Sequence, residues 1–141
     1  MKYKVIITAG GTSEKIDNVR KITNSSSGKL GCTIANKLIQ LHEKQIEKIY
    51  YICSKTSFKP THNKIEIIEI TDTNELETTV RKLLTSNDIH YFIHSMAVSD
   101  YTVDYVTTAE SLSLSINNNT NKSVVDLICE HNDNLNDNKI S

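Results

Sequence analysis

The sequence predicts a three-layer α/β fold with a mostly parallel sheet. Two observations lead to this prediction: short apolar segments alternate with amphipathic ones, and the glycines are concentrated around the first apolar segment and the first amphipathic one. Strands that alternate with helices of this length form crossover units, whose strands run parallel in one sheet. Right-handed crossovers are the default connection, so the pattern is typical of a Rossmann-like arrangement.

Four short apolar runs have the length and composition of buried strands. The first of them stops at a pair of glycines, which marks the end of a strand. We expect strands at Tyr3–Thr8, Ile49–Cys53, Ile65–Ile70 and Ile89–Ile93.

Two segments between these runs place apolar residues on one helix face. The first spans Lys29–Leu41, and its expected N-cap is Ser26 or Ser27, since a serine hydroxyl accepts from the free amides of a first turn. The second begins at Asp72, with Glu75 as its capping-box partner. The predicted core faces are Leu30, Ile34, Ala35, Leu38, Ile39 and Leu41 in the first helix, and Leu76, Val80, Leu83 and Leu84 in the second.

The whole chain, residues 1–141, is expected to form a single nucleotide-binding α/β domain, with residues 102–141 as a strand and flap region. A length of 141 residues suffices for one domain and is too short for two well-packed cores. Ser111–Ile116 alternates with period two, which predicts a half-exposed strand, and Ser123–Glu130 has the pattern of a short helix. The asparagine-rich stretches nearby contain too little apolar surface to pack, so we expect them to be mobile.

Charge and composition exclude several classes of function. The formal net charge is −1, whereas nucleic-acid-binding domains carry a basic surplus, and no apolar run approaches the roughly 20 residues that cross a bilayer. Met1 is followed by Lys2 rather than by the apolar stretch of a secretory signal. The cysteines, Cys32, Cys53 and Cys129, are expected to be reduced, and neither they nor the histidines show metal-ligand spacing. These observations predict a soluble, cytoplasmic protein.

The glycines indicate where a ligand binds. Gly10 and Gly11 end the first strand, while Gly28 and Gly31 lie at the start of the first helix, and glycine allows close approach to the backbone. Ligands of open α/β sheets bind beyond the carboxyl ends of the strands, where a helix N-terminus offers free amides to phosphate. The segment Ser25–Lys29 adds hydroxyl donors and a cation there. An ordinary serine-rich turn is the alternative interpretation.

Two standard nucleotide fingerprints are absent. The glycines after the first strand do not match G-x-G-x-x-G, and Leu30 stands where a P-loop has serine or threonine. Neither a nicotinamide dehydrogenase nor a P-loop nucleoside triphosphatase is favoured, and an oxidoreductase of the ordinary doubly wound type remains a weaker third hypothesis.

A second candidate site follows the fourth strand, in Ser95–Tyr101. Small side chains at the carboxyl end of a strand let a base or sugar lie against the backbone. The carboxylate of Asp100 is suited to accept a hydrogen bond from a ligand or to help hold Mg²⁺. A turn aspartate without a ligand is equally compatible with the sequence.

Three segments, in order and separation, carry a resemblance to a known family. They are Ile7–Thr12, the run from Asp17 to Gly31 that contains Asn24-x-Ser26-Ser27-Gly28, and Ala97–Tyr101. Together they resemble phosphopantothenate–cysteine ligase, also called phosphopantothenoylcysteine synthetase, over roughly residues 4–101. In many bacteria this enzyme is fused to a flavin decarboxylase. No decarboxylase half precedes Met1, so we expect the stand-alone bacterial form.

The resemblance implies a CTP-dependent ligation of cysteine to 4'-phosphopantothenate in coenzyme A biosynthesis. The substrate carboxylate attacks the α-phosphate of CTP and gives an acyl-cytidylate and pyrophosphate. The amine of cysteine then attacks the acyl carbon and releases CMP. Charge that builds up on phosphate calls for cations, amide donors and Mg²⁺. A homodimer is expected by the same resemblance.

The resemblance also implies roles for individual residues. Asn24 falls on the asparagine that serves the second step, and Arg20 on the residue that reaches the phosphate of phosphopantothenate, within the subunit or across a dimer interface. A lysine on a flexible flap promotes the first step, and Lys139 matches the start of that motif, with Lys122 as a competitor. The other expected contacts are Gly10, Gly11, Ser95, Met96 and Asp100 for the nucleotide, and Ser26, Ser27 and Gly28 for the substrate.

Two departures from the family pattern bear on activity. Related enzymes continue beyond the flap motif with further strands and nucleotide contacts, so we expect a chain that is truncated at its C-terminus. The alternative to a ligase is therefore a truncated, non-catalytic nucleotide- or phosphate-binding module of the same fold. Met96 stands where relatives often have alanine, which is expected to alter the fit at the nucleotide base.

Overall fold

The computed structural model describes residues 2–104 and 106–118. The chain separates into two compact units, Met1–Tyr101 and Thr102–Ser141, and each is described by itself. The expected limits of a single domain over residues 1–141 stay a prediction. No helix within the described ranges is long and apolar enough to cross a membrane.

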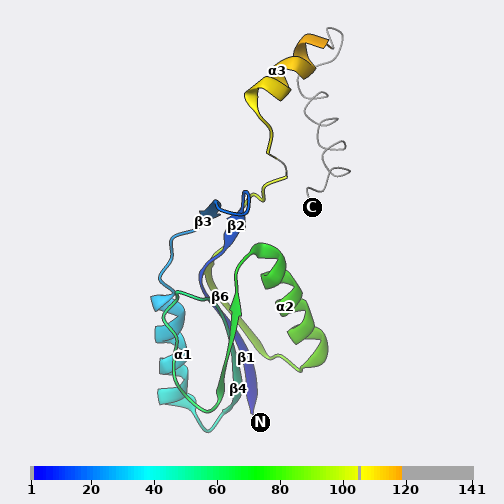
Figure 1. The fold of residues 1–141 in the computed structure, drawn as a ribbon. Coiled ribbons are helices and arrows are strands. Elements are labelled where there is room, and N and C mark those ends of the chain that lie inside the picture. The colour runs from blue at the N-terminus through cyan, green and yellow to red at the C-terminus, as the bar shows by residue number, and fades with distance from the viewer. Residues whose placement is uncertain (1, 105, 119–141) are drawn as a thin grey trace. The chain divides into compact units, whose positions relative to one another are not determined.

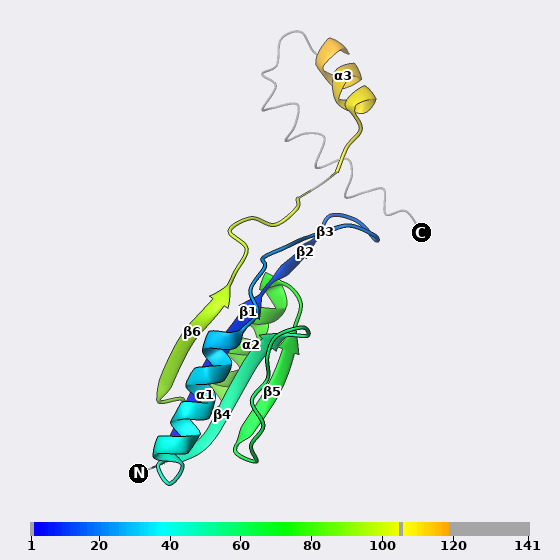
Figure 2. The same cartoon turned by 90° about the vertical axis from the view of Figure 1, so that its left-hand side faces the viewer.

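The first unit is built on a parallel sheet of four strands. These are β1 (Tyr3–Gly11), β4 (Ile46–Ser54), β5 (Ile65–Ile70) and β6 (Tyr91–Ala97), in the spatial order β5-β4-β1-β6. Figure 1 shows α1 (Lys29–His42) on one face of the sheet and α2 (Thr73–Ser86) on the other. In Figure 2 α1 lies in front of the sheet and α2 behind it. The predicted three-layer, Rossmann-like fold is confirmed.

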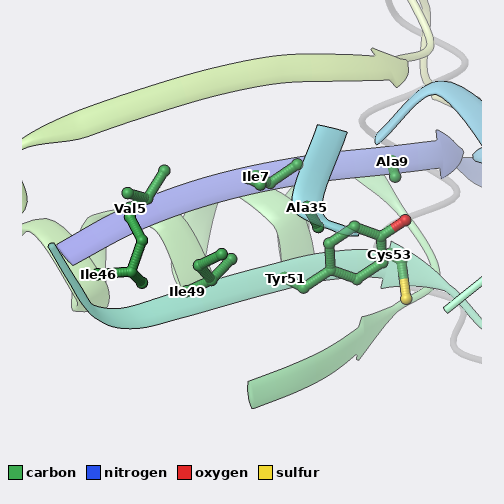
Figure 3. Packing of buried hydrophobic residues seen from close by; sticks show 8 residues of the cluster. All are labelled: Val5, Ile7, Ala9, Ala35, Ile46, Ile49, Tyr51 and Cys53. Carbon is green, nitrogen blue, oxygen red and sulfur yellow. The ribbon is translucent and has the colours of Figure 1, made fainter. Parts of the chain in front are cut away.

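Side chains of the central strands alternate between the two faces and form two cores. Val5, Ile7 and Ala9 of β1 pack on the α1 side (Figure 3), whereas Ile6 packs on the α2 side. Strands that are buried on both faces appear in the sequence as continuous apolar runs, so these strands could be predicted from the sequence. Burial raises the pKa of the Cys53 thiol in the first core to about 11, so its sulfur is a neutral packing group at pH 7. The first core comprises Val5, Ile7, Ala9, Ala35, Ile46, Ile49, Tyr51 and Cys53, and the second Ile6, Tyr50, Ile52, Ile70, Leu76, Leu83 and Met96.

The start of α2 confirms the cap predicted there. The Asp72 carboxylate accepts from the backbone amide of Glu75 at 2.8 Å. The Glu75 carboxylate turns back, as in a capping box, and accepts from the amide of Thr71 at 2.6 Å, one residue before the expected partner. The four-residue segment therefore satisfies two amides at the helix end.

The start of α1 differs from the prediction. The N-cap is Gly28, not Ser26 or Ser27, and no side chain caps the first turn. Ser27 Oγ lies 3.4 Å from the Lys29 amide, which is too long for a strong hydrogen bond. Gly28 has φ 71°, a left-handed conformation that glycine adopts without steric cost. The amide end of α1 is thereby left open toward the sheet edge.

A short hairpin, which the sequence did not predict, follows β1. Its strands β2 (Ser13–Lys15) and β3 (Lys21–Thr23) pair antiparallel. In the turn between them, the Asp17 carboxylate accepts from two backbone amides, at 2.7 and 2.8 Å. Such turns are typical of aspartate and asparagine.

The hairpin is attached to the sheet by polar contacts. The amide of Ser13 donates to the carbonyl of Thr71 at 2.8 Å. The buried carboxylate of Glu14 accepts from the amide of Thr73 at 2.9 Å and from its hydroxyl at 2.5 Å. Because these contacts join residues about 60 positions apart, no local apolar period reveals the hairpin.

The fourth strand of the sheet lies further along the chain than predicted. β6 spans Tyr91–Ala97 rather than Ile89–Ile93, since its pairing with β1 continues to Gly11 and Ala97. Ser95 and Met96 are therefore strand residues and not part of the loop after the strand. The last residues of β6 include small and polar ones, so the apolar run in the sequence ends before the strand does.

The second unit has a helix where the sequence predicted a strand. α3 spans Ala109–Asn118 and contains the predicted strand Ser111–Ile116. The Thr108 hydroxyl accepts from the amide of Ser111 at 3.1 Å and caps the helix. A six-residue alternation is a weak strand signal when the described part of the unit offers no second strand to pair with. The predicted helix Ser123–Glu130 and both candidate flap lysines, Lys122 and Lys139, lie outside the described residues.

Three predicted core positions are exposed to solvent. Leu30 and Leu41 of α1, and Leu84 of α2, lie at the margins of the apolar stripes. The buried residues of α1 are Gly31 and Ala35, and a Cβ on Gly31 would lie 2.6 Å from Ala9 Cβ of the sheet. The contact of α1 with the sheet is thus centred on small residues, and the buried face of this helix is narrower than the apolar pattern indicates.

Adjacent leucines of α2 give a matched test of this packing. Leu83 is 8% exposed and belongs to the second core, whereas Leu84 is 52% exposed. Leu83→Ala is expected to lower the free energy of unfolding by about 2–3 kcal/mol, and Leu84→Ala by less than about 1 kcal/mol. Urea unfolding followed by circular dichroism measures both, and equal losses would contradict the assigned core face.

Candidate functional site

Thr12, which directly follows β1, hydrogen-bonds to two loops that are distant in sequence. Its amide donates to the carbonyl of Ala97 at 3.0 Å, and its carbonyl accepts from the amide of Asn24 at 3.0 Å. The amide of Ser99 donates to the Thr12 hydroxyl at 2.9 Å, and the two hydroxyl oxygens are 3.0 Å apart. The Thr12 side chain is fully buried, so these bonds form in a low-dielectric environment.

Asn24 completes this junction. Its Nδ2 donates to Ser99 Oγ at 3.0 Å. Gly11 lies so close to the Asn24 backbone that an added Cβ would collide with the Asn24 carbonyl. We call Thr12, Asn24, Ala97 and Ser99 the Thr12 junction. It brings the two candidate sites of the sequence together at the carboxyl end of the sheet, next to β1 and β6.

Two glycines with positive φ bring a third loop to the same edge. Gly10 has φ 89° and Gly28 has φ 71°. A Cβ added to Gly28 would lie 3.1 Å from the Gly10 amide nitrogen and 2.9 Å from Ser57 Cβ, and one added to Gly10 would collide with the Ser57 hydroxyl. Ser57 in turn lies 2.6 Å from Ser54, hydroxyl to hydroxyl. The loop after β4 therefore packs against both glycines.

Tyr51 and Phe58 hold the Ser27–Gly28 turn in place through hydrogen bonds. The Tyr51 hydroxyl donates to the carbonyl of Phe58 at 2.9 Å, with the carbonyl of Gly28 3.4 Å away. The amide of Phe58 donates to the carbonyl of Ser27 at 3.0 Å. Burial raises the pKa of Tyr51 well above its ordinary value, so the phenol stays a hydrogen-bond donor.

A pocket of about 390 Å³ opens at this edge, between the hairpin, the serine loop and the loop after β4. The volume is in the range of small-molecule sites. None of its lining residues is acidic, and one, Lys21, is basic. The lining residues are Gly11, Ser13, Lys21, Thr23, Asn24, Ser25, Ser26, Ser27, Ser54 and Thr56.

The arrangement is suited to an anionic ligand. Hydroxyl groups of Ser25, Ser26 and Ser27 line the pocket, and the uncapped amide end of α1 begins immediately after them. Free amides and the positive end of a helix dipole favour phosphate. A phosphate-bearing molecule in this pocket would meet hydrogen-bond donors on several sides.

Some of the predicted site residues lie in the pocket and others do not. Gly11, Asn24, Ser26 and Ser27 line it, while Gly10 and Gly28 support it from the adjoining turn. Sequence reasoning missed the hydroxyl-rich segment Ser54–Ser57. Its position directly after an apolar strand is the signal that could have identified it, because the loops at the carboxyl ends of parallel strands meet at one edge.

Arg20 is not among the residues that line the pocket. Its guanidinium forms an exposed ion pair with Asp17, with an Nη2 to Oδ2 distance of 2.7 Å. Hydrogen bonds from the Arg20 amide, the Val19 amide and the guanidinium lower the pKa of Asp17 to about 2, so the carboxylate is charged at neutral pH. The substrate-binding role of Arg20 stays a prediction.

Ser95, Met96 and Gly31 have packing roles in the first unit. Ser95 Oγ donates to the carbonyl of Thr8 at 2.6 Å. The side chain of Met96 is 6% exposed and belongs to the second core. A Cβ on Gly31 would lie 2.6 Å from Ala9 Cβ and 2.8 Å from Ser95 Oγ, so this glycine allows α1 to lie close to the sheet. The predicted contacts of Ser95 and Met96 with a nucleotide stay predictions.

The described residues contain no cluster of three or more metal-ligating side chains. Asp100, which follows Ser99 of the Thr12 junction, is an exposed carboxylate beside the junction and is not one of the residues that line the pocket. A magnesium ion that is carried by substrate phosphates typically takes one or two protein carboxylates and several waters. A single aspartate here fits that mode of binding and not a dedicated metal cage.

An apolar pocket of about 320 Å³ lies at the opposite end of the sheet. Tyr3, Ile46 and Tyr91, which begin β1, β4 and β6, are among its lining residues. It offers few polar groups to orient a ligand, and ligands of open α/β sheets bind at the other end of the strands. The polar pocket at the Thr12 junction is therefore the candidate site.

The fold and the site define a Rossmann-like α/β domain with its candidate ligand site at the carboxyl ends of β1 and β4, beside the Thr12 junction. The family of the DNA/pantothenate metabolism flavoprotein C-terminal domain matches residues 1–134. The chain belongs to this family.

Named relatives agree with this assignment. The coenzyme A biosynthesis bifunctional protein CoaBC of Vibrio cholerae is 38% identical over 98 residues, which cover 70% of this chain and 23% of the relative. The crystal structure of the DNA/pantothenate metabolism flavoprotein from Streptococcus pneumoniae is 40% identical, with a TM-score of 0.69 over 80% of this chain and 49% of the other. The C-terminal domain of a CoaBC protein is 28% identical, with a TM-score of 0.62 over 82% of this chain and 58% of the other. The chain thus spans about a quarter of the curated relative, about half of the Streptococcus pneumoniae structure and less than two thirds of the CoaBC domain.

Replacement of Thr12 tests the junction. Thr12→Val keeps the shape of the side chain and removes the hydroxyl, which leaves the Ser99 amide without its acceptor. We expect a loss of about 1–3 kcal/mol in the free energy of unfolding, and faster hydrogen exchange of the Ser99 amide. Thr12→Ser keeps the hydroxyl and serves as the control. If the Ser99 amide exchanges at the same rate in all three proteins, the junction does not hold the loop.

Proposed function

We propose that this chain forms the substrate- and nucleotide-binding part of a ligase that joins cysteine to 4'-phosphopantothenate in coenzyme A biosynthesis. The reaction consumes CTP and passes through an acyl-cytidylate. One observation carries the proposal: the Thr12 junction places the Asn24 segment against the Ala97–Asp100 loop, beside a pocket that has no acidic lining residue. Membership of the family, with relatives named for coenzyme A biosynthesis, supports it.

Asn24 is proposed to serve the second step, in which the amine of cysteine attacks the acyl carbon and CMP leaves. The hydrogen bond from Nδ2 to Ser99 fixes the orientation of its side-chain amide. A fixed amide at a reacting carbonyl contributes to catalysis because it needs no reorganisation during the reaction. Asn24 is the one proposed catalytic residue that the structure describes.

The remaining assignments are also proposals. Gly10, Gly11, Ser95, Met96 and Asp100 are proposed for the nucleotide, with contacts from Met96 made by its backbone, since its side chain is in the core. Ser26, Ser27, Gly28 and Arg20 are proposed for the substrate, and Lys139, or in its place Lys122, for the flap. We further propose a homodimer located in the cytoplasm.

Magnesium fits this assignment through Asp100. When bound, the ion neutralises negative charge on the phosphates. Asp100 would hold it from the loop after β6, while Asn24, which bonds to the neighbouring Ser99, and the serine loop would hold and orient the substrate. Asp100 is not one of the residues that line the pocket, so the ion would lie beside the pocket, on the side of the loop after β6.

A non-catalytic phosphate-binding module is the second candidate. It is favoured by the pocket itself, whose serine and threonine residues and one lysine suit a phosphate compound without any catalytic group being required. Such a module would keep the pocket and its affinity for phosphate compounds. It would show no turnover.

Ligand-dependent stability tests the nucleotide site. A ligand that binds only the folded state raises the melting temperature. Because the proposed reaction consumes CTP, CTP with Mg²⁺ is expected to raise the melting temperature of the chain by more than ATP with Mg²⁺ at equal concentration. Differential scanning fluorimetry measures both shifts. If CTP gives no shift, both the ligase and its CTP dependence lose their support.

Substitution of Asn24 separates the two candidates. For a ligase, Asn24→Asp is expected to lower CMP release in the presence of CTP, phosphopantothenate and cysteine by about 100-fold and to accumulate acyl-cytidylate. Asn36→Asp on the exposed side of α1 is the matched control and should leave CMP release unchanged. Mass spectrometry detects the intermediate. CTP binding without CMP release from the wild-type chain would favour the binding module.

A further inference from the structure

The hairpin directs one row of side chains toward the pocket. Directly opposed residues of an antiparallel pair share a face of the ribbon. Ser13 opposes Thr23, with their hydroxyl oxygens 2.8 Å apart, and Lys15 opposes Lys21. Ser13, Thr23 and Lys21 line the pocket, whereas Lys15, two pairs nearer the turn than Ser13, does not. The hairpin therefore presents a lysine to the pocket from its inner face.

Lys15 and Lys21 form an unfavourable pair in the absence of an anion. Like charges directly opposite each other on neighbouring strands are destabilising. Neither lysine forms an ion pair within residues 2–104 and 106–118. The acidic residue of the hairpin, Glu14, lies on the other face and bonds to Thr73. The Asp17 carboxylate in the turn is paired with Arg20. A bound anion would relieve this repulsion.

Lys21 is the charged residue among those that line the pocket. Arg20 lies outside the lining, in its ion pair with Asp17. The lining also contains Asn24, Ser26 and Ser27, which are proposed for the substrate, and none of the residues proposed for the nucleotide except Gly11. The positive charge is thus on the substrate side of the site.

We propose that Lys21 is a specificity-determining residue of this pocket and binds the phosphate monoester of the substrate. The inference rests on the proposed function and assigns one further residue to its substrate site. The serine hydroxyls would donate neutral hydrogen bonds to the same phosphate. A lysine ammonium on a phosphate dianion forms charge-assisted hydrogen bonds, which are stronger than neutral ones. Selectivity for the phosphorylated over the unphosphorylated substrate would then depend on Lys21.

A comparison of two ligands that differ only in the phosphate tests this inference. We would measure the binding of 4'-phosphopantothenate and of pantothenate to the full chain by isothermal titration calorimetry without nucleotide, so that no reaction occurs, and the binding of CTP with Mg²⁺ in a separate titration. The variants are Lys21→Gln, Lys21→Arg and Lys15→Gln, the last as the control from the same ribbon face. Lys21→Gln is expected to weaken phosphopantothenate binding by about 10-fold and to leave pantothenate binding unchanged. Lys21→Arg and Lys15→Gln should stay within about threefold of wild type.

Stability distinguishes loss of a contact from loss of the fold. Without ligand, Lys21→Gln and Lys15→Gln should both melt at or slightly above the wild-type temperature, because either change removes the repulsion.

Equal loss of affinity for both ligands in Lys21→Gln, or an unchanged affinity for phosphopantothenate, would overturn the role of Lys21 and leave the proposed function intact. If wild type does not bind phosphopantothenate at all, the proposed function fails and this inference with it. If Lys21→Gln weakens CTP binding instead, the lysine belongs to the nucleotide.

Discussion

The hydrogen bonds of Thr12 are the interaction on which the rest of the site depends. One buried residue, placed immediately after the central strand β1, bonds to the carbonyl that ends β6, to the amide of Asn24 and to the loop residue Ser99. These partners are 12 to 87 positions away in the chain. Their contact converts three separate loops into one edge, so the side-chain amide of Asn24 has a defined direction.

The backbone around this junction is shaped by glycines for two different reasons. Gly10 and Gly28 take positive φ and let the loop after β4 pack against them, whereas Gly31 allows α1 to approach β1. Because the N-cap is Gly28, which has no side chain, no side chain caps the first turn of α1, and three serines precede this end of the helix. The pocket therefore combines residues of the serine loop, the hairpin and the loop after β4, close to the start of α1, and none of the lining residues is a carboxylate that would oppose an anion. This combination explains why a phosphate-bearing ligand suits the site.

Much of the fold could be predicted from the sequence, because β1 and β4 are buried strands that leave continuous apolar runs, and β5 at the edge of the sheet is rich in isoleucine. The features that the sequence did not reveal depend on tertiary contacts. The hairpin is held in place by the hydrogen bond from the Thr73 amide to the Glu14 carboxylate, and its own sequence shows no apolar periodicity. β6 extends over Ser95 and Met96 because it pairs with β1, and the alternation of Ser111–Ile116 is too short to distinguish a strand from α3. At the site, the order of the sequence motifs identified Asn24 and the serine loop. Ser54, Thr56 and Lys21 also line the pocket, but they come from other segments, and their position there depends on how the strands pair in the sheet.

The central claim is that the edge formed by the Thr12 junction, and not the opposite end of the sheet, receives the anionic ligands. Backbone amide shifts of the full chain, recorded by nuclear magnetic resonance during titration with 4'-phosphopantothenate and then CTP with Mg²⁺, measure this most directly. The account predicts the largest saturable shifts at Gly11, Asn24, Ser26 and Ser27, with little change at the other end. Saturable shifts centred on the apolar pocket at Tyr3, Ile46 and Tyr91, with residues 11–28 unaffected, would contradict it.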